Sequence, residues 1–266
     1  QPENAELMLG FLKSLVEQGR TVEIVPLVRQ ELARQPGESR WWGLLANAAL
    51  ETGDYHKALL VLESAHRLGA ASEEMLAGLG DLYADQGMYR EATAIYEEAG
   101  HAEGSPERLL RAATALLAVE RPAEARRVLA ALDNRDRELL PQQETERKRL
   151  AARCALLENQ VAAALVLLRS VLDDNPLDGA ALLLLGDQLS RESPDEALAY
   201  YTRAESIAGV KVQALLGMAR LETLRHHYTQ ALDHVQRALA LRPDPRVETF
   251  RDELLSITRS SAPNTP

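Results

Sequence analysis

Apolar residues recur along this chain at the spacing of amphipathic helices. Leu76, Leu79 and Tyr83 are one example, and positions three and four residues apart share one face of a helix. Leu, Ala, Glu and Arg dominate these segments, and all four are strong helix formers. No segment alternates apolar and polar residues as a half-buried strand does. The pattern therefore predicts an all-α chain.

A longer period overlies the helical one. The segment Gly53–Ala58 (GDYHKA) returns 34 residues later as Gly87–Ala92 (GMYREA). Further on, Pro176 and Pro243 stand where proline would end the second helix of a pair. The period predicts seven helix pairs, followed by a fifteenth helix over 246–259. The residue that opens each second helix, called the anchor below, recurs at intervals of 33 to 39 residues: Ile24, Ala58, Ala92, Ala125, Ala164, Ala197 and Ala231.

The small residues of this pattern have a packing reason. Two helices approach closely only where side chains are small, so we expect Gly80, Gly186 and the anchor alanines at helix crossings. We expect Trp42 in the core, whereas Trp41 either covers the junction with the first pair or belongs to a contact surface. The single cysteine, Cys154, lies near alanines, which predicts a buried thiol rather than a disulfide.

A period in the thirties with Gly, Tyr and Ala at these positions resembles the tetratricopeptide repeat family. The resemblance covers residues 5–259 and is closest in the second, third, sixth and seventh repeats. It implies an all-α fold, an α-solenoid of helix-turn-helix repeats wound into a right-handed superhelix, whose concave groove is lined by first helices. We expect one array over 1–259 and a flexible tail over 260–266. The expected repeats are 5–38, 39–72, 73–105, 106–144, 145–178, 179–211 and 212–245, and the helix over 246–259 caps them.

One interval of the repeat, at 39 residues, is longer than the others. The extra residues fall around 133–143, a polar segment that contains Pro141. Two interpretations stay open at this point. The segment is either a longer turn or extended helix between repeats, or a hinge between a block of four repeats and a block of three.

The resemblance also implies which positions of the first helices face the groove. Family members that clamp the acidic tails of chaperones carry Lys and Asn where this chain has Gly43 and Ala77, so that clamp is absent. The groove leucines are either apolar anchors for an extended or helical peptide, or are covered by neighbouring helices. The expected groove residues are Lys13, Asn47, Asp81, Leu110, Arg149, Arg153, Leu183, Asp187, Leu216 and Arg220.

Composition excludes several classes of function. The net charge is −10, and no basic run with interleaved aromatic residues is present, which argues against nucleic-acid binding. The longest apolar stretches, 161–168 and 180–185, are far too short to span a bilayer. No phosphate loop, HExxH motif or nucleophile elbow occurs. The turn at Asp174–Gly179 lacks ligands where a calcium loop needs them. We therefore expect no catalytic residue, no cofactor and no metal site.

These observations predict a non-enzymatic scaffold or adaptor that binds a protein or peptide partner in its groove. Arginine far outnumbers lysine, which suggests a bacterial source. The resemblance to the tetratricopeptide repeat family implies a multiprotein complex there, with envelope machinery as one setting. The alternative is a recruitment or regulatory domain of a larger enzyme such as a glycosyltransferase. The chain begins with Gln1, so a removed signal peptide and the periplasm are slightly favoured over the cytoplasm. The oligomeric state is open.

Overall fold

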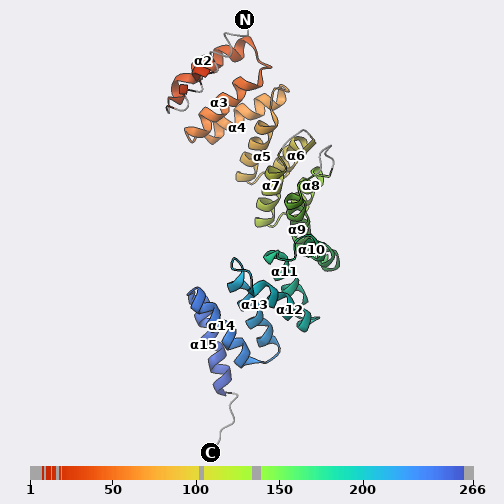
Figure 1. Cartoon of the computed structure of the whole chain (residues 1–266). Coiled ribbons are helices and arrows are strands. Elements are labelled where there is room, and N and C mark those ends of the chain that lie inside the picture. The colour runs from red at the N-terminus through yellow and green to blue at the C-terminus, as the bar shows by residue number, and fades with distance from the viewer. Residues whose placement is uncertain are drawn as a thin grey trace, which may run out of the picture. The chain divides into compact units, whose positions relative to one another are not determined.

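The computed structural model describes residues 8, 10–12, 14, 15, 18, 20–101, 105–133 and 139–260. Every regular element among these residues is an α-helix, so the predicted all-α class is confirmed (Figure 1). Where the described residues run on without a gap, turns of a few residues join successive helices, as expected for helix pairs. The helices divide into two compact units, Gln1–Gln143 and Glu144–Pro266.

The first unit is a stack of helix pairs. Within it, α3 packs against α4, α5 against α6, and α7 against α8. Across pairs, α4 packs against α5 and α6 against α8, so each pair contacts its neighbour along the chain as in a solenoid. Its helices are α2 (Thr21–Arg34), α3 (Ser39–Glu51), α4 (Tyr55–Arg67), α5 (Glu73–Asp85), α6 (Tyr89–His101), α7 (Pro106–Ala118) and α8 (Pro122–Ala131).

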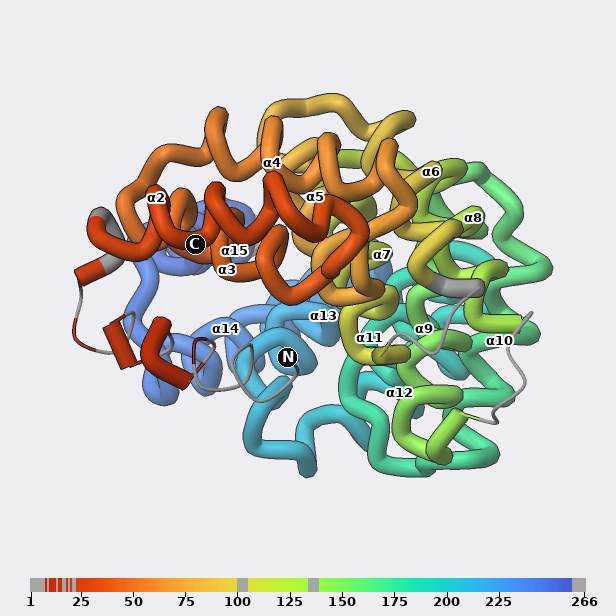
Figure 2. Tube along the Cα trace, turned by 90° about the horizontal axis from the view of Figure 1, so that it is seen from above, coloured from red at the N-terminus to blue at the C-terminus, as the bar shows by residue number. Residues whose placement is uncertain are grey.

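The second unit repeats the same arrangement. In both views α11 lies beside α12 and α13 beside α14 (Figures 1 and 2). The last helix, α15, packs on α14, where the sequence predicts a terminal helix. The helices are α9 (Pro141–Leu157), α10 (Val161–Asp174), α11 (Gly179–Leu189), α12 (Pro194–Glu205), α13 (Lys211–Leu224), α14 (Tyr228–Leu241) and α15 (Pro245–Ser260).

The anchor residues explain why the pairs are close. All seven, including Ile24, have 0% exposed surface. The small residues seven positions later are buried as well, since Ala65, Ala99, Ala204 and Ala238 are at most 4% exposed. The 34-residue period of the sequence therefore corresponds to a repeated buried position in the structure.

Two tyrosine rings fill the space that glycine leaves at the helix crossings. A Cβ atom built on Gly80 would lie 2.5 Å from Cε1 of Tyr96. Tyr201 lies between two glycines, because a Cβ on Gly186 or Gly217 would lie 2.6 Å or 2.4 Å from its Cε1. Such distances are far inside van der Waals contact, so these positions accept no larger residue without rearrangement.

The residue two positions before several second helices adopts a left-handed backbone. Gly53 and Gly87 have φ of 73° and 76° there, and Glu120, Asn159 and His226 have φ of 58°, 60° and 63°. Glycine takes this conformation at no steric cost, whereas a side chain does so only with strain. The turn thus has the same left-handed conformation in repeats that carry a residue other than glycine at this position.

The two tryptophans differ in how deeply they are buried. Trp41, at 2% exposure, is the fully buried tryptophan, while Trp42 is half-buried and donates its indole N–H to the carbonyl of Pro36 over 2.7 Å. Trp42 packs against the core cluster that contains Trp41, so the predicted core packing of Trp42 is confirmed, and Trp41 is the more deeply buried of the two.

The segment 133–143 falls at the boundary of the two units. Residues 134–138 lie outside the described part of the chain, and the boundary follows Gln143 directly. Pro141 opens α9, which has 17 residues where α5 and α7 have 13. Some of the extra residues thus lengthen a helix, and the hinge stays a prediction.

Candidate functional site

The expected groove residues lie on the first helix of each pair. Lys13 is outside the described residues. Asn47, Asp81 and Leu110 belong to the first unit, on α3, α5 and α7. The other six belong to the second unit, where α9 carries Arg149 and Arg153, α11 carries Leu183 and Asp187, and α13 carries Leu216 and Arg220.

In the first unit, the side chains of Leu110 and Asp81 are not available to bind a ligand. Leu110 is 6% exposed, so it is covered by neighbouring side chains and not open to a ligand. The carboxylate of Asp81 accepts a hydrogen bond from the Tyr96 hydroxyl over 2.6 Å. A small hollow of about 170 Å³ lies between α5, α6 and α7, but its rim residues Glu74 and Arg108 pair with each other at 3.1 Å.

Arg149, in the second unit, already has partners. Its guanidinium donates to Oδ2 of Asp178 over 2.9 Å and pairs with Glu146. Asp178 is 6% exposed, and its other oxygen caps α11 by accepting from the Ala181 N–H over 2.9 Å. Arg149 therefore joins α9 to the start of α11, which is a structural role.

Arg153 is different, because it is half-buried and makes no hydrogen bond or ion pair with the described residues. It follows Ala152, a member of the core cluster against which Leu183 packs. Leu183 and Leu216 are half-buried and both contact the next cluster, around Tyr201. Arg220 is exposed, and its Nε donates only to the carbonyl of Leu216, over 3.2 Å.

We call these residues the α9–α11–α13 face: Arg153, Leu183, Asp187, Leu216 and Arg220. The structure brings Leu183 and Leu216 to one cluster, and it brings Asp187 and Arg220 close to Tyr201. The Tyr201 hydroxyl donates to Asp187 over 2.6 Å. Burial, and next this hydrogen bond, raise the pKa of Tyr201, while the charge of Arg220 opposes the rise. The face thus combines two partly open leucines with two guanidinium groups that have no carboxylate partner among the described residues.

The buried tyrosines predict a loss of stability in alkali. Burial, followed by the Glu63 hydrogen bond, raises the pKa of Tyr83 to about 12, and burial raises the pKa of Tyr96 and Tyr201 further. Unfolded tyrosine ionises near its ordinary value of about 10. Above that pH the folded chain binds more protons than the unfolded chain, so the free energy of unfolding falls as pH rises from about 10 to 12.

Urea unfolding at pH 9, 10 and 11 measures this effect. Tyr201→Phe should flatten the pH dependence, and Tyr55→Phe, which alters an exposed tyrosine, is the matched control. Equal slopes for both variants and wild type would show that the buried phenols do not set the alkaline limit.

No constellation for catalysis or metal binding accompanies the face. Within the described ranges, no three His, Cys, Asp or Glu side chains are grouped so that they could hold a metal ion. Cys154 is buried, as predicted. None of the described helices combines the length and apolar character that a bilayer crossing requires.

Comparison with known proteins agrees with this architecture. Residues 73–99, which span α5 and most of α6, match the family model of the tetratricopeptide repeat. The chain has the tetratricopeptide-repeat fold. Arrays of this fold present surfaces to protein partners, and nothing found in the chain indicates an enzyme. The curated protein sequences contain no match to it.

Two solved structures show how far the fold extends. The C-terminal part of a tetratricopeptide-repeat protein from Cytophaga hutchinsonii is similar over 91% of this chain and 98% of its own, with a TM-score of 0.64 and 14% identity. A structure titled the APC/C hetero-tetramer Cut9–Hcn1 is similar over 92% of this chain, with a TM-score of 0.52 and 14% identity. This chain spans 48% of the matched chain in that structure. At such identity the likeness concerns the fold alone.

Proposed function

We propose that the chain is a non-enzymatic scaffold whose α9–α11–α13 face binds an acidic, partly apolar segment of a partner protein. The tetratricopeptide-repeat fold supports the general role. The observation that carries the specific role is Arg153, a half-buried residue whose guanidinium has no acceptor among the described residues. The lysine-poor composition supports a bacterial source, and the repeat fold supports a multiprotein complex as the setting, with the envelope as one location.

A guanidinium group without an acceptor in the protein has its N–H donors available to water or to a ligand. A carboxylate is the group that best satisfies guanidinium, since the two can form paired, charge-assisted hydrogen bonds. The chain carries a net charge of −10. A general excess of positive charge therefore does not explain the two arginines of this face. An acidic ligand fits the local chemistry.

The leucines supply the second part of recognition. Leu183 and Leu216 are half-buried and rest on one core cluster, so apolar side chains of a ligand could cover their exposed parts. A peptide laid across first helices would then place an apolar anchor between the guanidinium groups of Arg153 and Arg220. Grooves that read alternating anchors and charges are a common way to recognise peptides.

Peptide selection tests this proposal with defined ligands. A phage-displayed library of random dodecapeptides is selected on the immobilised full chain, and the best peptide is labelled for fluorescence anisotropy. We expect enrichment of peptides that combine Asp or Glu with Leu, Ile or Phe. Arg153→Glu combined with Leu183→Glu should weaken binding about tenfold or more, because one charge-assisted hydrogen bond contributes roughly 1.5–3 kcal/mol.

Arg242→Glu provides the control, since Arg242 is exposed at the end of α14 and outside the face. It introduces the same change of charge as Arg153→Glu alone and should leave the affinity within about twofold, as expected for an exposed charge outside the face. The proposal fails if no acidic peptides are enriched, or if both variants bind the selected peptide like wild type.

A further inference from the structure

A hollow in the second unit lies away from the α9–α11–α13 face. Its volume is about 530 Å³, within the range of ligand-binding pockets. Met218 and Glu222 of α13 line it, two residues beyond Leu216 and Arg220 respectively. Two residues correspond to about 200° around a helix axis, so α13 presents the hollow and the face on opposite sides.

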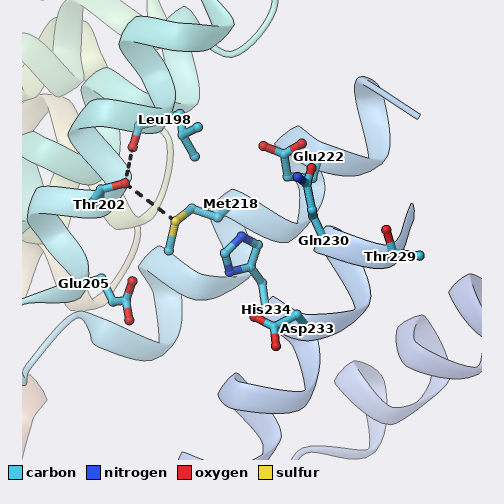
Figure 3. Close-up of a pocket in the computed structure, with 9 residues that line it drawn as sticks. All are labelled: Leu198, Thr202, Glu205, Met218, Glu222, Thr229, Gln230, Asp233 and His234. Carbon is cyan, nitrogen blue, oxygen red and sulfur yellow. Dashed lines mark hydrogen bonds between the residues drawn. The ribbon is translucent and has the colours of Figure 1, made fainter. Parts of the chain in front are cut away.

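Three successive helices build this pocket (Figure 3). An apolar floor is formed by Leu198 and Met218, and Thr202 donates its hydroxyl hydrogen to the Leu198 carbonyl over 2.8 Å. In Figure 3 the His234 ring points from α14 toward Met218, and Glu205 faces them from α12. The remaining lining residues are Glu222, Thr229, Gln230 and Asp233.

The rim carries more negative than positive charge. Glu205 pairs with Arg237, which also lies 3.7 Å from Asp233. The side chain of Asp233 is 65% exposed, so its carboxylate can accept a further donor besides Arg237. Burial lowers the pKa of His234, so its ring is neutral at neutral pH and adds no positive charge.

Glu222 adds a buried carboxylate to the same pocket. Its side chain is 6% exposed, and Oε2 lies 2.7 Å from Nδ1 of His227. Oε1 lies 4.0 Å from Arg225, which makes a shorter pair of 3.0 Å with Asp195. The second oxygen of this buried group therefore has capacity for a further donor.

We propose that this pocket between α12, α13 and α14 binds a basic segment of a partner protein. A lysine or arginine side chain fits both features of the lining, because its alkyl stem packs on Met218 and Leu198 while its charged end meets the carboxylates. The volume exceeds that of one such side chain, so a neighbouring apolar residue of the segment is accommodated as well. The chain would then bind acidic and basic segments on opposite sides of α13.

Methionine methyl resonances report on this site directly. The chain has four methionines, and Met218 lines the pocket while Met8, Met75 and Met88 lie in the first unit. The full chain labelled with [methyl-¹³C]methionine is titrated with the acetylated and amidated peptide Ala-Lys-Leu-Lys-Ala. Met218→Leu assigns the reporting resonance. We expect a saturable shift of the Met218 methyl while the other three stay in place, which also shows that the first unit is unaffected.

Matched peptides and variants distinguish recognition of the lysine charge from nonspecific apolar binding. Peptides with norleucine or glutamate in place of lysine should leave Met218 unshifted. Asp233→Asn should weaken the lysine peptide about threefold, the loss of one exposed ion pair. Asp173→Asn, which alters an exposed carboxylate of α10 outside the pocket, should have no effect.

Several outcomes would overturn the proposal: no shift of the Met218 methyl, an equal shift by the norleucine peptide, or an unchanged affinity in Asp233→Asn. Putrescine, a free diamine, is the last probe. If it shifts Met218 at the same concentration as the peptide does, the pocket takes a small amine and not a partner segment. None of these results bears on the α9–α11–α13 face, because that face lies on the other side of α13.

Discussion

Gly80→Ala lowers the free energy of unfolding by about 1–3 kcal/mol, the usual range for overpacking a tight core. The new Cβ would lie 2.5 Å from Cε1 of Tyr96, with the Cδ1 and Cζ atoms of the same ring also within 2.9 Å. Tyr96 is 3% exposed and its hydroxyl is bound to Asp81, so the ring cannot turn away without loss of that bond. Gly80→Leu should cost at least as much.

Gly78→Ala is the matched control, because it lies in the same helix, α5. The nearest atom to its added Cβ is Cδ1 of Leu62 at 3.9 Å, an ordinary contact. Alanine is favoured over glycine in a helix by up to about 1 kcal/mol, so this change should stabilise the chain or leave it unaffected. The two substitutions are thus expected to differ in sign.

Urea unfolding followed by tryptophan fluorescence suits this comparison, because Trp41 and Trp42 lie in the same unit as Gly80. In a Tyr96→Leu background the cost of Gly80→Ala should shrink, since the ring that it strikes is gone. An unchanged midpoint for Gly80→Ala would mean that the register of the third repeat is wrong.

Asp178→Ala is expected to lower the free energy of unfolding by about 2–4 kcal/mol. Loss of the cap on α11 accounts for roughly 1 kcal/mol, and leaving a partly buried Arg149 without this partner adds about 1–3 kcal/mol. Both contacts are made by a side chain that is itself 6% exposed. Far-UV circular dichroism in urea measures the change.

Asp54→Ala separates the two contributions. Asp54 caps α4 by accepting from the Lys57 N–H over 3.1 Å, but it is exposed and its carboxylate has no arginine partner among the described residues. It should cost about 1 kcal/mol, the contribution of a cap alone. If Asp178→Ala costs no more than this control, the contact to Arg149 adds nothing, and Arg149 returns to the set of residues available to a ligand.

The sequence predicts the helices and their pairing well, because these features depend on local spacing. The anchors at Ala58 and Ala92, for example, can be identified from the repeated segment alone, and both have 0% exposure. Gly80 and Gly186 likewise indicate close helix approach through their residue type and their place in the repeat. The sequence does not reveal which side chain fills the space beside each glycine, since Tyr201 contacts glycines on both α11 and α13.

The candidate site is less predictable for a physical reason. A repeat pattern indicates which positions lie on first helices, but not which side chains meet across repeats. Arg149 and Asp178 are 29 residues apart, and no local signal joins them. The pair Glu146 and Arg149, three residues apart, is recognisable in the sequence as a helical ion pair. The pocket beside Met218 requires three helices to be placed together, which no periodicity describes.

Photo-crosslinking in cells of the source organism shows whether the first helices of the second unit contact a partner. The crosslinker p-benzoylphenylalanine is placed at Gln213, which is exposed on α13 three residues before Leu216. Arg242, exposed at the end of α14, receives the same probe as the control. We predict one discrete crosslinked product from position 213 and none of that size from 242. A discrete product from 242 with none from 213 would contradict partner contact through the first helices.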